Sequence, residues 1–407
     1  MLAAGFAALG SGCNTYDLSG VPEPEDTPQS VVSTTPQPTA AVTESGAPET
    51  SANASESATA PVSESSVTTV PQISLTTTAA TTTAPETSST PATEKPNDKI
   101  NSYRKIGESG ILVAGINNHY WGIMFFGGTY GYCDMYVENV KEFQAALPEV
   151  NVCSMVIPTS VDFYNPDDYK GYSELQKDKI EYVEKELSSS GITNIKVYDV
   201  LKSHTDEPIY ARTDHHWMPL GAYYAAEKFC KDLKLTISPL DKYKAVTCPD
   251  YVGSMYYYSE DEKLNNDPED YTVYYSPNAS KLETSYYDRK YSNGYDGNLF
   301  IVSDASSYYL TFLGGDDKMT HIKTDVKNGR NLVVIKESYG NALIPFLTEA
   351  FENIYVIDLR YCEINAVDFC KKVKATDLLF ANCAYTVAGG NCEYFEYIRT
   401  VKAKANI

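Results

Sequence analysis

The stretch NLVVIKESYGNA, residues 331–342, indicates the fold class of this chain. Asn331 is followed by four consecutive apolar residues, a pattern typical of a strand that is buried on both faces. A polar turn follows, and the spacing at 341–351 predicts a helix. An apolar strand that runs through a short turn into a helix is the repeating unit of a parallel sheet, so this stretch predicts an α/β fold.

The same alternation recurs along the chain. Further helices are predicted at 137–147, 172–189 and 219–233, and further strands at 111–114, 151–157, 195–200, 299–302, 354–359 and 377–381. Strands that are apolar throughout predict a mainly parallel sheet with helices on both faces, a three-layer α/β/α arrangement. The tyrosine-rich region 242–298 has no clear period and is predicted as a possible insertion. Its rings serve either as stacking platforms for sugars or as ordinary loop packing.

Residues 14–97 differ from the rest in composition. They are rich in Ser, Thr, Pro and Ala, and they carry ten Asp or Glu and one Lys. Such a segment cannot bury enough apolar surface to offset its chain entropy. It is predicted to be a disordered stalk, followed by one folded α/β domain at 98–407.

The first 13 residues resemble a bacterial lipoprotein signal. A short apolar run from Leu2 to Leu9 is followed by small residues and Cys13, which would carry the lipid. The alternative is a disordered N-terminus with an isolated cysteine. The lipoprotein interpretation predicts an extracytoplasmic protein at a bacterial cell surface, held to the membrane only through this anchor.

Charge and cysteine content narrow the range of partners. The net charge is −21 and no stretch forms a basic stripe, which argues against nucleic acid as a partner. Eight cysteines remain besides Cys13, and an even number in an exported protein permits disulfides without specifying their pairing. No spacing resembles a zinc site, so no metal or cofactor is predicted.

Ser338 lies where the strand predicted at 332–335 gives way to a helix. Sites in open parallel sheets form at the carboxyl ends of strands, and backbone N–H groups at a helix start can stabilise an oxyanion. A serine at this position is also a frequent helix N-cap. The local pattern alone leaves both roles open for Ser338.

The stretch RTDHHWMP, residues 212–219, offers the groups that a catalytic serine requires. A serine nucleophile needs a nearby base, and the base needs an orienting carboxylate. Two of the five histidines of the chain are adjacent here and follow an aspartate. The alternative is a capped helix start with a packed tryptophan and a solvated histidine.

The motif YARTDHHW at 210–217, followed by GAYY at 221–224, resembles the signature of the bacterial DHHW family. That family is similar to the SGNH hydrolase superfamily and to the alginate O-acetylation proteins. The resemblance spans roughly 111–385 and implies an SGNH-hydrolase-like fold. Its further matches are KESY at 336–339 with IPFL at 344–347, DLRY at 358–361, and the weaker IPTS at 157–160 and FLGG at 312–315.

The resemblance also implies roles for individual residues. Ser338 is the nucleophile, His216 is the general base, and Asp214 orients His216. The residues expected to support them, with the first as an alternative base, are His215, Trp217 and Arg212. The backbone N–H of Ser338 is expected in the oxyanion hole, and the further oxyanion or substrate candidates are Gly315, Asp316, Tyr339 and Asn382.

Asp316 departs from the family pattern. The resemblance leads us to expect asparagine there, and an ionised aspartate cannot donate a hydrogen bond to an oxyanion. Asn382, at the end of the last predicted strand, is a substitute donor in this interpretation. A milder departure is Glu337, where aspartate is usual.

Together these features predict a cell-surface acyl-transfer enzyme. It would be an O-acetyltransferase or acetylesterase that acts on a cell-envelope or extracellular polysaccharide, with a membrane-bound O-acyltransferase as a possible partner that supplies acetyl groups. The alternative, supported by Asp316, is a catalytically weak or inactive lipoprotein that binds a glycan.

Overall fold

The computed structural model describes residues 96–301, 305 and 307–403. The predicted signal segment, the predicted stalk and Cys13 all lie outside these residues. The described residues belong to one structural unit of the chain.

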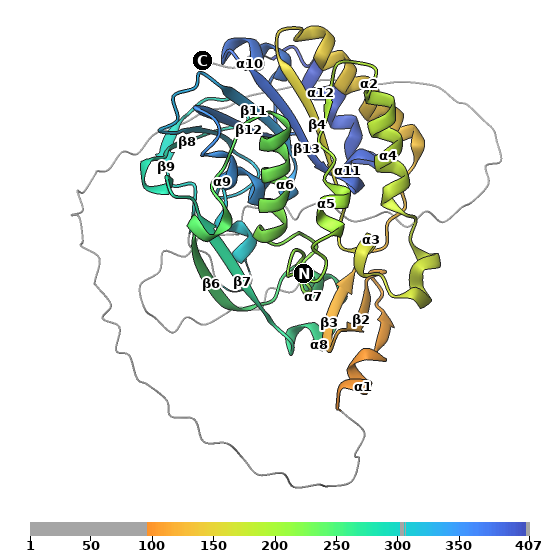
Figure 1. Ribbon diagram of the computed structural model, residues 1–407. Coiled ribbons are helices and arrows are strands. Elements are labelled where there is room, and N and C mark those ends of the chain that lie inside the picture. Colours follow the sequence, from red (N-terminus) through yellow and green to blue (C-terminus); the bar gives the residue numbers. More distant parts are fainter. Residues whose placement is uncertain (1–95, 302–304, 306, 404–407) are drawn as a thin grey trace, which may run out of the picture. The chain divides into compact units, whose positions relative to one another are not determined.

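A large eight-stranded sheet forms the centre of this unit (Figure 1). Five neighbouring strands are parallel, in the order β5 (Thr193–Asn194), β4 (Asn151–Ile157), β13 (Asp377–Cys383), β11 (Asn331–Lys336) and β12 (Asn353–Asp358). Beyond β12 the sheet continues with the antiparallel strands β10 (Met319–Lys323), β8 (Glu283–Tyr287) and β9 (Tyr295–Gly297). The fold is therefore mixed α/β, and the expectation of parallel pairing holds for five strands.

Helices pack against both faces of this sheet (Figure 1). One face carries α2 (Tyr130–Ala146), α4 (Gln176–Leu187), α10 (Ala366–Lys372), α11 (Ala384–Val387) and α12 (Glu393–Thr400). The other carries α6 (Pro219–Asp232) and α9 (Ile344–Leu347), with α5 (Tyr198–Lys202) beside α6. On the first face, the Phe380 ring of β13 meets Phe143 of α2 and Phe395 of α12 at centroid distances of 5.1 and 5.8 Å.

Two smaller sheets lie outside the main one. The first is antiparallel, with β1 (Arg104–Ile106), β2 (Leu112–Ile116) and β3 (His119–Ile123). The second is a two-stranded ribbon of β6 (Lys244–Tyr251) and β7 (Glu269–Tyr275). The remaining short helices are α1 (Pro96–Asn101), α3 (Val161–Tyr164), α7 (Ser254–Ser259) and α8 (Glu262–Asn265).

Local sequence accounts for the main elements. The four apolar residues from Leu332 to Ile335 are wholly buried in β11, since both faces of the sheet are covered. Helix α2 begins after Thr129, whose hydroxyl accepts the Tyr132 N–H at 3.3 Å. The helix then buries the residues Cys133, Tyr136, Val137, Val140 and Phe143, at the spacing of one helical face.

Four element predictions need correction. The strand expected at 111–114 belongs to the small antiparallel sheet, and the strand expected at 299–302 is reduced to one bridge between Phe300 and Phe312 among the residues described there. The apolar run at 195–200 turns into helix α5 at Tyr198, because a short apolar run suits a buried helix as well as a strand. The helix expected at 341–351 is a 3₁₀ turn followed by the short α9.

The tyrosine-rich region 242–298 is not wholly an insertion into the sheet. Its second half supplies β8 and β9 to the main sheet, while its first half forms the β6–β7 ribbon with α7 and α8. Tyr251 and Tyr271 in this ribbon are 1% and 0% exposed, so these rings pack in the interior and offer no surface for a ligand.

None of the eight cysteines in the described part of the chain forms a disulfide. Only Cys248 among them is partly exposed, and the other seven are buried. The structure therefore shows them as small apolar packing residues rather than as a disulfide framework.

Gly221 in helix α6 provides a test of how the core positions the loop at 210–218. A Cβ at this position would lie 2.6 Å from the Ile209 carbonyl oxygen, which accepts the Met218 N–H that closes the loop. We expect Gly221→Ala to lower the free energy of unfolding by about 1–3 kcal/mol, because this clash outweighs the roughly 1 kcal/mol that alanine gains in a helix. Urea unfolding measures the change. Gly127→Ala, where a Cβ meets no atom within 4 Å, is the control, and equal midpoints for both variants would contradict the packing argument.

Candidate active site

Ser338 follows the carboxyl end of β11 and opens the 3₁₀ turn η5 (Ser338–Leu343). The cap of this turn is Glu337, whose carboxylate accepts the Tyr339 N–H at 2.9 Å and the Cys383 N–H at 2.7 Å. Ser338 itself is partly exposed, whereas Glu337 and Tyr339 are buried. The interpretation of Ser338 as an N-cap is therefore wrong, and its hydroxyl is available for other contacts.

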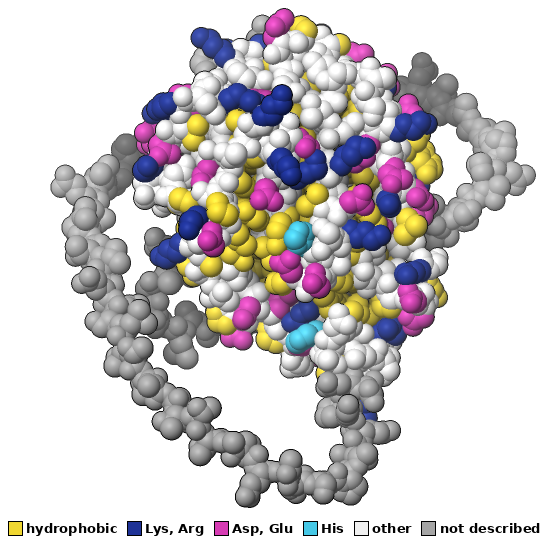
Figure 2. All heavy atoms as spheres, in the orientation of Figure 1, with side chains coloured by type: hydrophobic (Ala, Val, Ile, Leu, Met, Phe, Trp, Pro, Cys, Tyr) yellow, Lys and Arg dark blue, Asp and Glu magenta, His cyan; other side chains and the backbone are white. Residues whose placement is uncertain are grey.

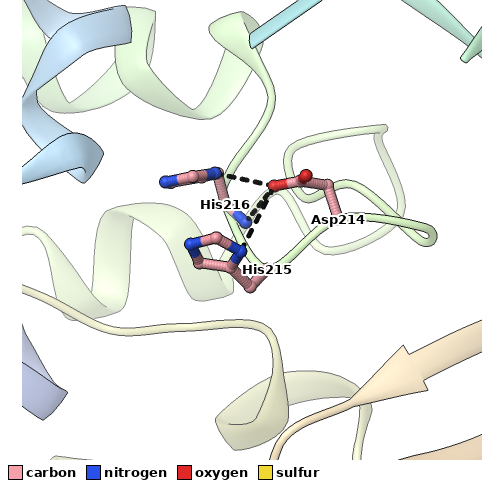
Figure 3. A group of neighbouring side chains, drawn as sticks. All are labelled: Asp214, His215 and His216. Atoms are coloured by element: carbon pink, nitrogen blue, oxygen red, sulfur yellow. Dashed lines mark hydrogen bonds and ion pairs between the residues drawn. The ribbon is translucent and has the colours of Figure 1, made fainter. Parts of the chain in front are cut away.

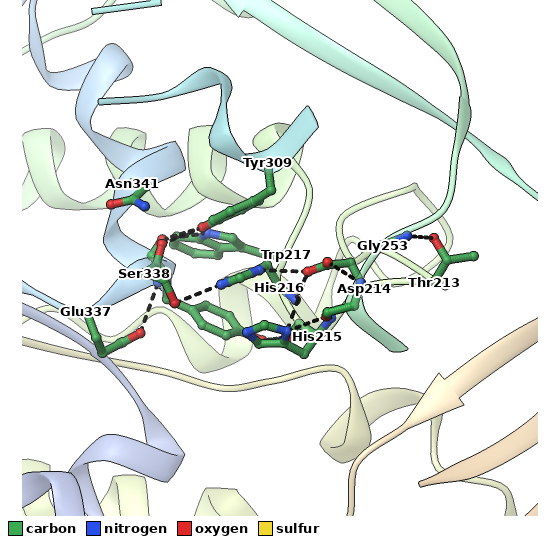
Figure 4. Close-up of polar contacts among 12 residues, drawn as sticks. Thr213, Asp214, His215, His216, Trp217, Gly253, Tyr309, Glu337, Ser338 and Asn341 are labelled. Atoms are coloured by element: carbon green, nitrogen blue, oxygen red, sulfur yellow. Dashed lines mark hydrogen bonds and ion pairs between the residues drawn. The ribbon is translucent and has the colours of Figure 1, made fainter. Parts of the chain in front are cut away.

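His216 brings this turn together with the loop at 210–218 (Figure 4). Its Nε2 lies 2.8 Å from the Ser338 Oγ, and its Nδ1 lies 2.7 Å from the Asp214 Oδ1. Ser338 and His216 are 122 residues apart in the sequence. A hydroxyl bonded to an imidazole that a carboxylate orients can release its proton to that imidazole as the oxygen attacks an electrophile.

The Asp214 carboxylate is held by several donors. Its Oδ1 accepts both the backbone N–H and the ring of His216, and its Oδ2 accepts the Ser254 N–H at 2.8 Å. Burial alone would raise the pKa of Asp214. The His216 and His215 rings and these hydrogen bonds instead hold its pKa well below the usual range. Asp214 is thus ionised at neutral pH.

Gly253 allows this close approach to Asp214. A Cβ at Gly253 would lie 2.3 Å from the Asp214 Oδ2. The Gly253 N–H is bonded to the Thr213 hydroxyl at 3.1 Å, which keeps the two segments together. A larger residue at 253 would displace the carboxylate from His216.

Asp214, His215 and His216 form a group whose ligand atoms could in principle surround a metal ion (Figure 3). Their present contacts are hydrogen bonds. Both ring nitrogens of His216 are engaged, and the Nδ1 of His215 lies 2.5 Å from the Ser254 Oγ. An ion bound here would replace the Asp214–His216 bond, so the arrangement suits a proton relay better than a metal centre.

Aromatic residues surround His216. The Tyr309 ring is stacked on its imidazole at a centroid distance of 3.7 Å and an angle of 6°, and the Tyr309 hydroxyl donates to the Ser338 carbonyl at 2.8 Å. Trp217 is wholly buried and donates its Nε1–H to the Tyr339 carbonyl at 2.9 Å. Tyr339 in turn donates its hydroxyl to the His215 carbonyl at 2.5 Å. These bonds connect the loop that carries the histidines with the turn that carries Ser338.

Arg212 and Thr213 are anchored by Glu269 of β7. The Glu269 carboxylate accepts the Arg212 N–H at 2.8 Å and both the N–H and the hydroxyl of Thr213 at 2.7 Å. The Arg212 guanidinium itself pairs with Asp267 at 2.8 Å. Arg212 therefore holds the start of the loop rather than contacting Ser338 or His216.

Asp316, whose side chain is 21% exposed, belongs to a largely buried ionic cluster next to the Ser338 turn. Its carboxylate accepts from Lys336 at 2.9 Å, from Arg360 at 2.8 Å and from the Asn341 amide at 2.8 Å. Lys336 and Arg360 also bind Asp358. Two carboxylates thus face two cations, so Asp316 does not present an unmatched negative charge to the site.

The pKa shifts agree with this pairing. Burial pushes the pKa of Asp316 upward, but Lys336 and Arg360 hold it well below its usual range. Burial likewise lowers the pKa of Lys336, and the two carboxylates overcome this effect and raise it. Both groups therefore remain charged.

The remaining oxyanion candidates have no hydrogen bond to Ser338. Gly315 adopts a φ of 124°, which only glycine accepts easily, in the loop that leads to Asp316. Asn382 on β13 is wholly buried, and neither atom of its side-chain amide has a hydrogen-bond partner among the described residues. Tyr339 contributes the hydrogen bond from its hydroxyl to the His215 carbonyl, which connects the turn to the loop.

Sequence reasoning missed several residues that hold the site together. Gly253, Ser254 and Glu269 lie in the tyrosine-rich region, where no periodic pattern draws attention to them. Tyr309 is one of 34 tyrosines. The local sequence offered two weak signals: the adjacent pair Gly253 and Ser254, and the acidic residue Glu269 at the start of a strand. Neither signal indicates that Glu269 contacts a loop 56 or 57 residues away.

The ionic cluster makes stability depend on pH. The pKa of Asp316 is lower in the folded chain than in the unfolded one. Its contribution is therefore complete above the ordinary Asp value of about 4 and is lost as the pH falls through the lower folded value. We expect Asp316→Asn to cost about 3 kcal/mol at pH 7, because it leaves two buried cations with one carboxylate.

Urea unfolding between pH 3 and pH 7 measures this effect, and the gap between wild type and Asp316→Asn should narrow below about pH 4. Asp317→Asn is the matched control, because its side chain is 47% exposed and pairs with the partly exposed Lys318, so its loss should cost less than about 1 kcal/mol. A difference in the free energy of unfolding between wild type and Asp316→Asn that increases as the pH falls would contradict the assignment.

Comparisons with known proteins address the fold and the family. A family model described as "DHHW protein" matches residues 83–357. No curated protein sequence matches the chain. Among solved structures, Bacillus cereus PatB1 with a sulfonyl adduct is 15% identical, with a TM-score of 0.58 over 70% of this chain and 98% of that chain. This likeness shows a shared fold.

Two further structures match. The O-acetyltransferase domain of Pseudomonas putida AlgJ is 12% identical with a TM-score of 0.40, over 73% of this chain and 98% of that domain, which is too weak to support an argument. A DHHW family protein from Eubacterium siraeum is 39% identical with a TM-score of 0.67, over 71% of this chain and 95% of that chain. The family model and this relative together show that the chain belongs to the DHHW protein family.

Proposed function

We propose that the protein is an acyl-transfer enzyme in which Ser338 is the nucleophile, His216 the general base and Asp214 the residue that orients the base. The observation that carries the proposal is the continuous chain of two hydrogen bonds, 2.8 Å from Ser338 to His216 and 2.7 Å from His216 to Asp214. A packed helix start would need neither bond, whereas a serine nucleophile needs both.

In the first half of the reaction, the Ser338 Oγ attacks the carbonyl carbon of an acetyl ester and its proton passes to the His216 Nε2. The Asp214 carboxylate stabilises the resulting imidazolium. The leaving alcohol takes the proton from His216 as its bond to the carbonyl carbon breaks. In the second half, a sugar hydroxyl or water gives its proton to His216 and attacks the carbonyl carbon of the acyl-enzyme. The bond from that carbon to the Ser338 Oγ breaks, and Ser338 takes the proton back from His216.

Two features would support the transition state. Backbone N–H groups at the start of η5, beginning with that of Ser338, are the donors we assign to the oxyanion, with Gly315 as a further candidate. The stacked Tyr309 ring faces the imidazole of His216, where a positive charge develops during proton transfer. The pairing of Asp316 with Lys336 and Arg360 removes the charge conflict that favoured an inactive protein.

The substrate that we propose is an acetylated or acetyl-accepting polysaccharide of the cell envelope or its surroundings. The resemblance of the DHHW motif to the polysaccharide O-acetylation proteins supports this class. A likeness to AlgJ, which is described as an O-acetyltransferase domain, points the same way but is too weak to count as support. An acetyltransferase outside the cytoplasm needs a donor, and a membrane-bound O-acyltransferase is the proposed supplier.

The proposed location is extracytoplasmic, with Cys13 as the lipid anchor. Among the described residues, no helix is long and apolar enough to cross a bilayer. On the face seen in Figure 2, basic and acidic side chains are interspersed, so this face offers no basic patch for anionic lipid headgroups. The anchor remains a proposal that rests on the N-terminal sequence.

Replacement of the nucleophile or the base tests the proposal directly. We expect Ser338→Ala and His216→Ala each to reduce kcat/KM for 4-nitrophenyl acetate by a factor on the order of 10³ or more. His204→Ala is the matched control, because this partly exposed histidine pairs with Glu207 and has no hydrogen bond to the site. Unchanged turnover in both variants would refute the mechanism. Retained glycan binding with no turnover in wild type would favour the binding-protein alternative.

A sulfonyl fluoride tests the activation of Ser338 without a choice of substrate. The oxygen of an activated serine displaces fluoride from sulfur, and we expect one covalent adduct on the peptide that contains Ser338 in wild type. His216→Ala should slow its formation by a factor on the order of 10² or more, because the proton then lacks an acceptor. Peptide mass spectrometry measures the site and the rate. Equal labelling of wild type and Ser338→Ala would contradict the assignment.

A further inference from the structure

Three aromatic rings from outside the tyrosine-rich region 242–298 gather on the surface. Phe125 follows β3, and Tyr169 and Tyr172 lie on the 3₁₀ turn η1 (Asp167–Tyr172). Tyr172 is 63% exposed, and Phe125 and Tyr169 are partly exposed. This cluster, the Phe125–Tyr169–Tyr172 platform, is among the most open aromatic surfaces in the described part of the chain.

The three rings form an offset stack. Their centroids are 5.2, 5.5 and 6.4 Å apart, and their planes differ by 33°, 25° and 9°. In a column of three stacked rings, the outer two would be about twice as far apart as neighbours, whose centroids lie roughly 4.5–7 Å apart. At 5.2 and 5.5 Å, rings with similar planes are too close to lie side by side in one plane. Tyr172 is therefore offset-stacked against both Phe125 and Tyr169, and its outer face stays open.

The segment that leads to Phe125 is hydrogen-bonded to two segments that flank the site. The chain runs from Gly122, whose N–H is bonded to the Arg212 carbonyl at 2.8 Å, to Met124, whose carbonyl accepts the Tyr385 hydroxyl at 2.6 Å. Arg212 begins the loop that carries Asp214, and Tyr385 is on α11, which follows β13 beside β11. In Figure 1, β3 and α3 accordingly lie at the same end of the main sheet as α7.

The charges around the platform are paired. Three acidic side chains on or next to η1 each have a basic partner. The pairs are Lys170–Asp167 at 2.5 Å, Arg104–Asp168 at 3.5 Å and Lys179–Glu174 at 2.8 Å. A polyanionic chain would find no cationic surface here and would be repelled by the net charge of −21.

We infer that the Phe125–Tyr169–Tyr172 platform binds the pyranose rings of a neutral glycan beside Ser338. The C–H face of a pyranose is flat and apolar, and the open face of Tyr172, supported by Phe125 and Tyr169, is its physical complement. The inference rests on the proposed function for its substrate class and adds two statements to it: the place of a sugar subsite, and a preference for uncharged sugars.

Isothermal titration calorimetry on the Ser338→Ala protein tests the platform without turnover. The probes are the neutral hexasaccharides cellohexaose, mannohexaose and chitohexaose, and a hexauronate of equal length. We expect at least one neutral hexasaccharide to bind, the hexauronate to bind more weakly, and Tyr172→Ala to raise the Kd of the neutral probe about tenfold. Tyr172→Phe keeps the ring and should keep the affinity, while Phe125→Ala with Tyr172→Ala should abolish binding.

Tyr397→Ala is the control for the loss of an exposed tyrosine, because Tyr397 is 47% exposed on α12, and thermal unfolding checks that each variant is folded. No binding of any neutral probe, equal affinity in Tyr172→Ala, or stronger binding of the hexauronate would overturn the inference. Loss of phosphatidylcholine-vesicle binding in the double variant, without glycan binding, would also overturn it and indicate a membrane contact. Glycan binding that depends on Tyr172, in a protein without Ser338-dependent ester turnover, would refute the proposed function alone.

Discussion

The geometry of the site depends on one buried carboxylate, that of Asp214, which stays ionised away from bulk water. A buried charge is tolerated only when donors replace its hydration shell. Here His216 and the Ser254 N–H supply those donors, and the absence of a side chain at Gly253 lets the second segment approach. Because the Nδ1 of His216 faces this carboxylate, its Nε2 is directed at Ser338. The position of the proposed base therefore follows from how Asp214 is solvated.

The sequence predicted what depends on local pattern. The strand at 331–336, the turn at Ser338 and the helix at 219–232 each follow from apolar runs, from the change in period, or from Pro219 at a helix start. The motif resemblance then predicted that Ser338 and His216, which are 122 residues apart in the sequence, belong to one site. The supporting contacts could not be predicted in this way. The bonds from Ser254 to Asp214 and from Thr213 to Glu269 join segments 40 and 56 residues apart, and no periodic pattern marks either partner.

Asp316 shows why a residue type should be judged with its partners. From the sequence alone, an ionised carboxylate next to an oxyanion site argues against catalysis. In the folded chain its charge is matched by Lys336 and Arg360, and Asp358 completes the set. Lys336 ends β11 and Asp358 ends β12, so the cluster joins the two strand ends. The charges of the cluster thus act mainly on one another, and their ion pairs hold the two strand ends together next to the turn.

The abundance of tyrosine has a physical explanation in the loops around the site. Loop carbonyls that lie inside a protein lack the partners that strands and helices provide, and each needs a donor. Buried tyrosine hydroxyls supply these donors at the carbonyls of Ser338, His215, Pro158 and Met124. A tyrosine ring fills apolar space while its hydroxyl reaches a distant backbone, which suits a site built from separate loops. The tyrosines that donate these four hydrogen bonds therefore hold loops together around the site. Rings with an open face, such as that of Tyr172, are the ones available for contact with a ligand.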